Sequence, residues 1–488
     1  MSSDKQKARR RHHTIAQLGS RAGLTAAGRL LIGCALALSA ISPAAARTSG
    51  DSRIIVSVPG QQNDVVNISA RGLFHTFESD FFLQDDGTMY VQTGDIPAMW
   101  LRDSSAQTLP YVRFLPYFPA LAPTARQVIE RNARNVLTDP YANAFTAAYR
   151  VWEEKWEPDS LAYPINLAWS YWKTTGDRGV FTQRLQWSFI RTLRTYDCEQ
   201  HHATCSGYTS AFLPNRGRGA HFVPTGMVWS AFRPSDDPVR YPFNIPQEML
   251  AAVSLTDLAD MEQGGFHDFA LASRARLMAQ EIRAGVERYG VVYDMRFGWI
   301  YAYEVDGRGN SERMDDANLP NLLSAIYFGY TSASESLYQN TRRFVLSPYD
   351  PYYYRGRYAA GLGSSHTPTG WVWPLAMIAR GLTAATPAEV AQALLDIQGT
   401  RSPQGYMRES FDPNDPNRFT RAEFGWANAL YAELVFRSVA ELSSGADART
   451  PDGTLFAAPV QTPRVVGSVE ALRNAEIIAS TLQSVLDI

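Results

Sequence analysis

Helical periodicity recurs along most of this chain and leaves little room for other regular structure. Between residues 64 and 82, apolar side chains return every three or four positions, as they do on one face of a helix. Similar patterns occur at residues 103–114, 123–137, 159–174, 179–196, 244–263, 267–289, 319–327, 333–346, 372–382, 387–397, 420–438 and 468–486. Strand-like patterns are short and lie in connections, at residues 89–92, 290–294 and 299–304. The sequence therefore predicts an all-α fold.

Six long connections separate these helical patterns. They are rich in Trp, Tyr, Gly, Pro and acidic residues, and they cover residues 83–101, 139–158, 203–242, 304–318, 347–370 and 398–418. Long loops inside a compact domain usually serve function. Six of them interleaved with helix pairs predict a toroid of helical hairpins, an (α/α)6 barrel with minor short strands in its loops. The long loops would gather at one mouth of this barrel.

The first 46 residues have the character of a secretory signal peptide. Basic residues precede an apolar run at 30–41, and Ala44-Ala45-Ala46 offers a small-residue cleavage site. The run is too short for a membrane span of about 20 residues. We expect residues 1–46 to be removed and the mature protein to be periplasmic or secreted. Lipidation of Cys34 is an alternative, because residues 31–34 loosely resemble a lipoprotein box, although the apolar run continues beyond them.

The remaining chain is expected to form one domain. Residues 47–62 have the composition of a linker, and no break in composition interrupts residues 60–445. A stretch rich in Ala, Gly, Asp, Pro and Thr at 441–465 precedes a predicted packing helix at 466–488. The barrel and this helix together make residues 63–488 a single predicted domain.

The charge balance limits the possible partners. The whole chain has 46 basic and 48 acidic residues; residues 1–46 account for seven of the basic and one of the acidic, so 39 and 47 remain, a net charge of −8. A nucleic acid or an anionic membrane would require a basic face. A neutral ligand fits this balance better.

Removal of the leader leaves two cysteines, Cys198 and Cys205, in the sequence Cys-Glu-Gln-His-His-Ala-Thr-Cys. Two neighbouring cysteines in an oxidising compartment most simply form a local disulfide. His201 and His202 lie between them and leave a zinc site as an alternative, since two Cys and two His are a legitimate ligand set.

The long loops share one kind of chemistry. No Ser, Cys or Lys stands out as a nucleophile, and the motifs of dinucleotide-binding, P-loop and zinc-protease sites are absent. Carboxylates and aromatic residues are abundant instead. Glycoside hydrolysis uses that set, with one carboxylic acid to protonate the leaving oxygen and a second to attack or to activate water. No metal or cofactor is expected.

The segment from Gly94 to Ser104 contains more candidate binding residues than any other stretch of similar length in these loops. It contains Asp95, Trp100, Arg102 and Asp103, and Pro97 prevents it from being one uninterrupted helix. A helix is expected to begin near Trp100. An indole face beside a guanidinium and carboxylates suits a sugar ring with its C–H faces and hydroxyl edges. A buried Arg–Asp pair at a helix start, with Trp100 in the core, is the alternative.

The other loop candidates each have a structural alternative. The pair Asp236-Asp237 precedes a proline and is common turn chemistry. The pair Asp315-Asp316 precedes a predicted helix. For at least one of the two aspartates, the favoured interpretation is that it caps this helix. Glu409 is also compatible with a surface ion pair, and His366 with a loop histidine whose hydrogen bonds are satisfied.

Six motifs in one order resemble glycoside hydrolase family 125, the metal-independent exo-α-1,6-mannosidases. They lie at residues 94–104, 232–237, 314–318, 361–368, 409–412 and 424–428. The resemblance runs from about Asn63 to Glu433. It implies an (α/α)6 barrel and the release of non-reducing terminal mannose with inversion of the anomeric centre.

This resemblance assigns roles to individual residues. The general acid falls on Asp236 rather than Asp237, and the general base on Glu409. A general acid must be protonated near working pH, so we expect an upward shift of the Asp236 pKa. The substrate-binding candidates are Asp95, Trp100, Arg102, Asp103, Arg233, Asp237, Asp316, Asn318 and His366.

Two departures from the family pattern lie beside the base. Arg408 stands where a His often precedes the base, and Glu423 where a bulky residue is more usual. We expect them to influence the leaving-group side of the site or the pKa of Glu409. The expected substrate is a mannose-containing oligosaccharide or glycan, and a monomer is favoured. The rival hypotheses are an (α/α)6 glycosidase acting on another α-glycan and a non-catalytic carbohydrate-binding protein.

Overall fold

The computed structural model describes residues 62–444. Its α-helices are α3 Gln62–Asp80, α4 Leu101–Phe114, α5 Ala122–Thr138, α6 Pro158–Thr175, α7 Gln183–Gln200, α8 His202–Cys205, α9 Pro214–Gly217, α10 Ile245–Met261, α11 Phe269–Tyr289, α12 Ser336–Val345, α13 Pro374–Leu382, α14 Pro387–Thr400 and α15 Gly425–Ser444. The signal peptide, nearly all of the linker at 47–62 and the helix predicted at 466–488 lie outside the described residues. Helix α15 continues to Ser444, so residues 441–444, predicted to begin a linker, are helical.

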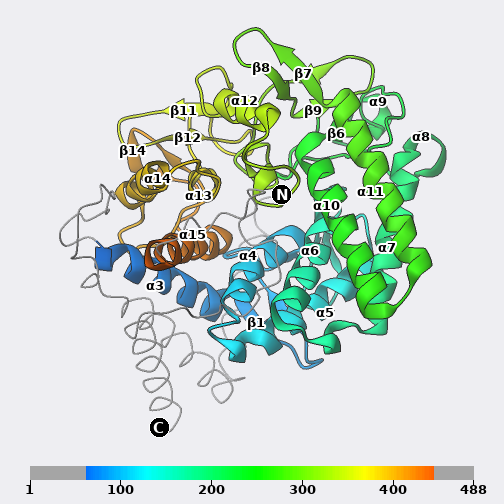
Figure 1. Cartoon of the computed structure of the whole chain (residues 1–488), viewed down its shortest axis with the longest axis horizontal. Helices are drawn as coiled ribbons and strands as arrows, with labels where there is room; N and C mark the ends of the chain where they lie inside the picture. The colour runs from blue at the N-terminus through cyan, green and yellow to red at the C-terminus, as the bar shows by residue number, and fades with distance from the viewer. Residues whose placement is uncertain (1–61, 445–488) are drawn as a thin grey trace, which may run out of the picture.

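The long helices form two concentric rings (Figure 1). The inner ring contains α4, α6, α10, α13 and α15, with a 3₁₀ turn at Leu323–Ile326 (η5) between α10 and α13. Each inner element contacts the next, and α15 closes the ring against α4. The outer ring contains α5, α7, α11, α12, α14 and α3, each beside one inner element. The predicted (α/α)6 barrel is confirmed.

One inner position departs from the expected helix at 319–327. The structure has only the turn η5 there, because the Ser324 hydroxyl donates to the Asn321 carbonyl at 2.9 Å, and an α-helix would need that carbonyl for the N–H of Ala325. The Asp315 carboxylate accepts hydrogen bonds from the N–H groups of Leu322 and Leu323, at 2.8 and 3.0 Å. The side chain of Asn321 accepts another from the N–H of Ser324. Asp315 therefore binds the first N–H groups of η5 from several residues away, whereas the N-cap position predicted for the 315–316 pair is occupied by Leu322.

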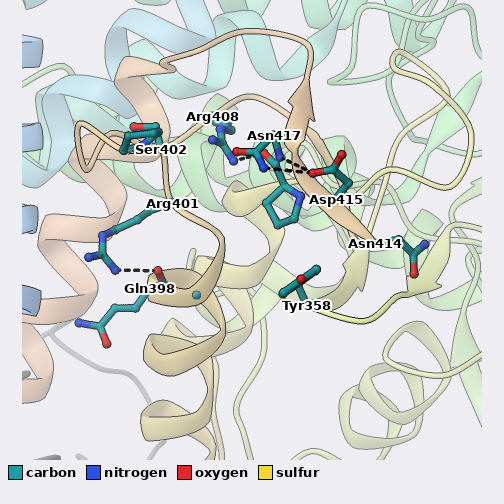
Figure 2. A pocket seen from close by; sticks show the side chains of 11 residues that line it. Tyr358, Gln398, Arg401, Ser402, Arg408, Asn414, Asp415 and Asn417 are labelled. Atoms are coloured by element: carbon teal, nitrogen blue, oxygen red, sulfur yellow. Dashed lines mark hydrogen bonds between the residues drawn. The ribbon is translucent and has the colours of Figure 1, made fainter.

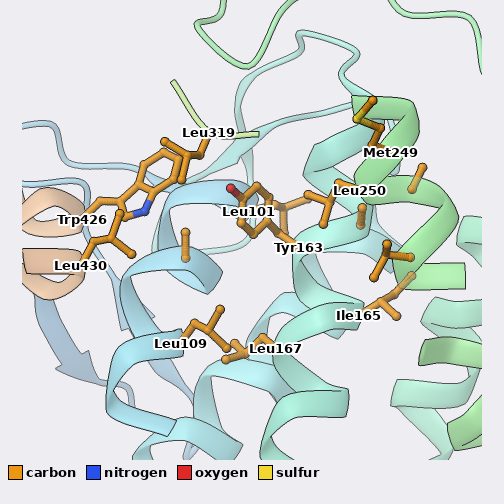
Figure 3. Packing of buried hydrophobic residues seen from close by; sticks show 14 of the residues in the cluster. Leu101, Leu109, Tyr163, Ile165, Leu167, Met249, Leu250, Leu319, Trp426 and Leu430 are labelled. Atoms are coloured by element: carbon orange, nitrogen blue, oxygen red, sulfur yellow. The ribbon is translucent and has the colours of Figure 1, made fainter. Parts of the chain in front are cut away.

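Inner helices are buried on nearly all sides, which explains their weakly amphipathic sequences. In α4, the Arg113 side chain is the only one that is not buried. Figure 3 shows how α4, α6, α10 and α15 pack through Leu109, Leu167, Leu250 and Leu430. Full burial of one such leucine contributes about 1.5–3 kcal/mol. This core holds the starts of α4 and α6, where the site residues lie.

The strands form small antiparallel sheets in the connections between helices. They are β1 Phe81–Leu83 with β2 Met89–Val91; β3 Met99–Trp100, β4 Ala144–Phe145 and β5 Val151–Glu153; β6 Phe243–Asn244, β9 Glu304–Val305 and β10 Ser311–Glu312; β7 Val291–Asp294 with β8 Gly298–Tyr301; β11 Tyr353–Arg355 with β12 Ala360–Leu362; and β13 Phe411–Asp412 with β14 Asp415–Phe419. The β3–β4–β5 sheet joins the first two long loops, with Trp100 opposite Ala144. The β6–β9–β10 sheet joins the end of the third to the fourth.

A disulfide links Cys198 at the end of α7 to Cys205 in α8, as the local-disulfide hypothesis expects. The intervening His202 stacks on Trp229 at a ring separation of 3.7 Å and lies 2.6 Å from Glu199. Its ring is thereby engaged in packing. Among the helices described between residues 62 and 444, none is long and apolar enough to cross a membrane.

Candidate active site

Five of the six long loops contribute to one pocket at the mouth of the barrel. Its volume is about 230 Å³. It is lined by Thr93, Ile96, Trp100, Arg102, Asp103, Pro234, Ser235, Asp236, Asn318, His366, Trp373, Glu409, Arg421, Phe424 and Trp426. Both proposed catalytic carboxylates, Asp236 and Glu409, are among them. Aromatic walls beside carboxylates and cations are what a sugar-binding pocket requires.

The Gly94–Ser104 segment forms one wall of this pocket. Trp100 precedes α4 in an extended conformation and caps its start, so the helix begins where the sequence predicts. The indole N–H of Trp100 is buried and has no hydrogen-bond partner in the described protein. Asp103 lies in the first turn of α4 and is buried in the same wall. Asp95 instead lies exposed outside the pocket lining, 2.5 Å from Arg421.

Arg102 lies at the centre of a buried carboxylate cluster. Its Nη1 donates to Glu157 Oε2 at 2.7 Å and to Asp159 Oδ2 at 3.2 Å. Its Nη2 donates to Asp236 Oδ1 at 2.7 Å, and its Nε lies 3.6 Å from Asp103 Oδ2. Arg102 therefore forms the buried ion pair that was the alternative for this segment. It also lines the pocket, so its binding of sugar stays a prediction.

A tight turn points Asp236 into the pocket. The N–H of Asp236 bonds to the carbonyl of Arg233, and the N–H of Arg233 bonds to the carbonyl of Asp237. Asp236 has a φ of +63°, in the left-handed region where a residue other than glycine costs about 1–3 kcal/mol. Asp is among the residues that tolerate this region best. The strained residue is the proposed acid.

Asp237 turns away from Asp236 toward a neighbouring loop. Its carboxylate accepts a 2.5 Å hydrogen bond from the Ser365 hydroxyl and lies 3.4 Å from Nδ1 of His366. It does not line the pocket. The adjacent aspartates thus have different surroundings, and only Asp236 faces the pocket where substrate would bind.

The expected upward pKa shift of Asp236 is not found. Burial acts to raise the pKa of Asp236, but Arg102 and then Lys155 outweigh that effect and lower the pKa to about 2. The neighbouring Glu157 shows the opposite shift, because burial raises its pKa well above the usual range. The predicted rise in the Asp236 pKa was wrong. It was based on burial and on the neighbouring Asp237, whereas Arg102 and Lys155 come close to Asp236 only in the folded chain.

Glu409 is buried on the side of the pocket formed by the sixth loop. Its Oε1 lies 3.4 Å from Nη1 of Arg421, so the ion pair expected as its alternative role exists but is buried. Arg421 also donates to the Thr93 carbonyl at 2.9 Å and contacts Asp95. Arg421 was missed by the sequence analysis because residues 420–438 were expected to be helical, whereas α15 begins at Gly425.

The two departures from the family pattern lie outside this pocket. Arg408 lines a separate depression of about 690 Å³, shown in Figure 2 with Tyr358, Arg401 and Asn414. Its guanidinium donates to the carbonyls of Thr400 and Pro416. Glu423 pairs with His75 at 2.6 Å, and the His75 ring stacks on Tyr406. Neither side chain contacts the pocket at Glu409, so any influence on the base would be indirect.

The remaining candidates divide between the pocket wall and its support. Asn318 lines the pocket, and its side-chain amide donates to Asp316 at 3.1 Å. Asp316 is fully buried behind it and also accepts from the Ser364 hydroxyl at 2.9 Å. Arg233 does not line the pocket and instead binds Glu304 at 2.5 Å. Asp316 and Arg233 therefore hold other loop residues in place.

His366 brings a third positive charge near Asp236, after Arg102 and Lys155. The hydrogen bond that His366 donates to the Asp237 carboxylate raises the His366 pKa to about 9; burial opposes this shift, and the charges of Asp236, Asp237 and Glu409 add to it. His366 lines the pocket. A protonated imidazole at this wall adds a donor that can serve a sugar hydroxyl.

A protein-family model described as metal-independent alpha-mannosidase (GH125) matches residues 62–436. The chain belongs to glycoside hydrolase family 125. Family 125 membership makes the protein a glycoside hydrolase and agrees with the pocket, whose lining comes almost entirely from the motifs that resemble the family.

Two further comparisons agree with family 125 membership. A Streptococcus pneumoniae metal-independent α-mannosidase, solved in a non-productive complex with α-1,6-mannobiose, is 37% identical, with a TM-score of 0.74, over 77% of this chain and 94% of that one. The meiotically up-regulated gene 157 protein of Schizosaccharomyces pombe is 34% identical over 71% of this chain and 75% of its own. A bacterial glucoamylase complexed with acarbose shares the fold, at 14% identity and a TM-score of 0.50 over 77% of this chain and 55% of its own.

Proposed function

We propose that this family 125 protein is an exo-acting α-1,6-mannosidase that inverts the anomeric centre. The observation that carries this proposal is the convergence of Asp236 and Glu409, 173 positions apart in the numbering, on one small pocket with Trp100. The S. pneumoniae relative was solved with α-1,6-mannobiose, which supports the same linkage here.

In this proposal Asp236 protonates the glycosidic oxygen as it leaves. Glu409 deprotonates a water molecule that attacks the anomeric carbon from the opposite face. An inverting enzyme keeps its two carboxyl groups about 6.5–9.5 Å apart to leave space for that water. The guanidinium of Arg421, 3.4 Å from Oε1 of Glu409, would hold this carboxylate in place for that step.

The terminal mannose would be held by the residues that line the pocket. Trp100 offers an indole face and an unused N–H, and Arg102, Asp103, Asn318 and His366 offer donors and acceptors for hydroxyl groups. Asp237, Asp316 and Arg233 would support this wall from behind, and Asp95 would act at the rim through Arg421. These roles narrow the substrate-binding set predicted from the sequence.

A substrate panel tests this function. The purified protein would be incubated with α-1,2-, α-1,3- and α-1,6-mannobiose and with α-glucobiosides, with and without EDTA. We expect mannose release from the α-1,6 compound alone and no effect of EDTA. Activity on α-glucosides would favour a glycosidase for another α-glycan, and no activity with measurable binding would favour a carbohydrate-binding protein. Activity abolished by EDTA would contradict a metal-independent mechanism.

The proposal for the cellular location rests mainly on the signal-peptide character of residues 1–46. We propose export to the periplasm or beyond after cleavage of residues 1–46, with the Cys198–Cys205 disulfide as a feature suited to an oxidising compartment. Mass spectrometry of the mature N-terminus and fractionation of expressing cells would test it. A retained leader in the cytoplasmic fraction would contradict it.

A further inference from the structure

The cluster around Arg102 has more carboxylates than one guanidinium can neutralise. Asp103, Glu157, Asp159 and Asp236 all lie within 3.6 Å of its nitrogens. Glu157 and Asp159 are fully buried, and Arg102 is 3% exposed. Buried charges without a partner are costly, and such groups bind a proton rather than remain ionised. The cluster therefore has a place for at least one proton.

The carboxyl groups of Glu157 and Asp236 bind the two terminal nitrogens of the same guanidinium, each at 2.7 Å. Oε2 of Glu157 accepts hydrogen bonds from Arg102 and, at 3.1 Å, from the Ser160 hydroxyl. Its Oε1 is buried and accepts no hydrogen bond from any donor in the described protein. Because the two carboxyl groups bind adjacent nitrogens of one guanidinium, they are close neighbours, and a hydrogen bond between them contributes to the pKa shift of each. Two carboxyl groups can share a hydrogen bond only if one of them carries a proton.

The surroundings place this proton on Glu157. Burial raises the pKa of Glu157, whereas Arg102 and Lys155 lower that of Asp236 against the effect of burial. Asp159 also raises the Glu157 pKa, and His366 lowers the Asp236 pKa. The charged groups that face the pair are Arg102, Asp103, Lys155, Asp159 and His366. An ionised Asp236 poses a problem for its proposed role, because a general acid needs a proton to donate.

We propose, on the basis of the proposed function, that Glu157 is a positioning residue that stores the proton Asp236 gives to the leaving group. As substrate binds, the O–H bond of Glu157 breaks and an O–H bond forms on Asp236. Asp236 then gives this proton to the glycosidic oxygen as the bond to the anomeric carbon breaks. Glu409 takes a proton from the attacking water. Glu157 regains a proton from solvent, and Glu409 releases one.

Two substrates distinguish proton delivery from a purely structural role. Glu157→Gln retains the size of the side chain and a donor toward Asp236 but cannot release a proton. We expect its kcat for α-1,6-mannobiose to fall about 10- to 100-fold, whereas an activated aryl mannoside such as 2,4-dinitrophenyl α-mannoside reacts within about threefold of the wild-type rate, because its leaving group needs no proton. A fall of equal size on both substrates would overturn the proposal.

The pH dependence gives a second readout. In the wild-type protein the pair titrates as a unit, so Asp236 retains access to a proton above its own pKa. In Glu157→Gln the alkaline limb for mannobiose should move down by at least about one pH unit. The matched control is Asp159→Asn, which removes another buried carboxylate bound to the same Nη1 of Arg102. Asp159→Asn should lower the rates on mannobiose and on the aryl mannoside by the same factor. A selective loss of activity on mannobiose in this variant would contradict a specific role for Glu157.

Two further variants guard against ambiguous results. Glu157→Asp retains an acidic group but withdraws it by one methylene from Asp236; if the Gln variant does not fold, this variant should show the same selective loss on mannobiose. Asp236→Asn tests the proposed function itself. If it loses both substrates equally, the assignment of Asp236 as acid fails. If it loses mannobiose selectively while both Glu157 variants behave as wild type, only the proton-storage proposal fails.

Discussion

Nη2 of Arg102 donates a 2.7 Å hydrogen bond to Oδ1 of Asp236 across 134 positions of sequence. This contact joins the start of α4 to the turn that carries the proposed general acid. It also changes the expected role of Arg102. With Nη1 and Nη2 bonded to carboxylates of the protein, the guanidinium positions the acid as much as it holds sugar.

Loss of Arg102 should destabilise the fold as well as reduce activity. Arg102→Met leaves Glu157, Asp159 and Asp236 without their shared cation, and removal of one partner from a buried ion pair costs about 3–5 kcal/mol. Urea denaturation followed by circular dichroism measures the change. Arg240→Met is the control, because the Arg240 side chain is 65% exposed and its pair with Glu312 lies at the surface. Equal stability of the two variants would contradict the central place of Arg102.

Activity should require glycine at position 94, because a larger residue there would displace the Arg421 side chain. Gly94 has a φ of +54°, and a Cβ atom there would lie 2.9 Å from Nη2 of Arg421. Gly94→Ala should lose about 1–2 kcal/mol of stability from the left-handed backbone and also lose activity by displacing Arg421. Gly87→Ala separates the effects, because its φ is +78° and no atom lies within 4 Å of the added carbon. Melting temperatures should fall in both variants, and activity only in Gly94→Ala; unchanged activity there would contradict the role of Arg421.

Arg421 should position the general base. Arg421→Gln removes the cation 3.4 Å from Glu409, and misplacement of a catalytic group by about 1 Å costs on the order of 100-fold in rate. We expect kcat on α-1,6-mannobiose to fall about 10- to 100-fold with a smaller change in KM. Arg418→Gln is a control from the same loop, with a side chain that is 64% exposed. Comparable kinetics for the two variants would refute this prediction.

His366 should contribute to stability in a defined pH window. The hydrogen bond that its ring donates to the Asp237 carboxylate raises the His366 pKa to about 9, above the value of about 6.5 for an unfolded histidine. Protonation then favours the folded state, so the contribution is complete below about pH 6.5 and disappears as the pH rises through about 9. The difference in melting temperature between wild type and His366→Gln should shrink across this range. His221→Gln, at an exposed position, controls for loss of a histidine elsewhere, and a pH-independent difference for His366→Gln would contradict the assignment.

Local patterns were sufficient to predict the barrel. Helices α4, α5 and α6 begin and end within two residues of the predicted bounds, because apolar periodicity and capping act over a few neighbouring positions. The long loops were likewise evident from their Pro, Gly and acidic content. The segment at 319–327 failed as a helix because the Ser324 hydroxyl occupies the Asn321 carbonyl, a bond between side chain and backbone that periodicity does not reveal.

The sequence predicted the site residues that lie in recognisable motifs, and it did not predict the others. Trp100, Arg102 and Glu409 lie in the pocket as expected, but Glu157 and Arg421 were missed because their importance arises from partners more than ten positions away in sequence. The prediction of a raised pKa for Asp236 was wrong for the same reason. Its pKa depends on Arg102 and Lys155, whose proximity only the fold determines.

The anomeric configuration of the first product tests the central claim most directly. Proton NMR during the hydrolysis of α-1,6-mannobiose, recorded before mutarotation, distinguishes the two anomers of released mannose. An inverting mechanism with Asp236 as acid and Glu409 as base predicts β-mannose as the first product. Initial formation of α-mannose would mean retention through a covalent intermediate and would contradict these assigned roles.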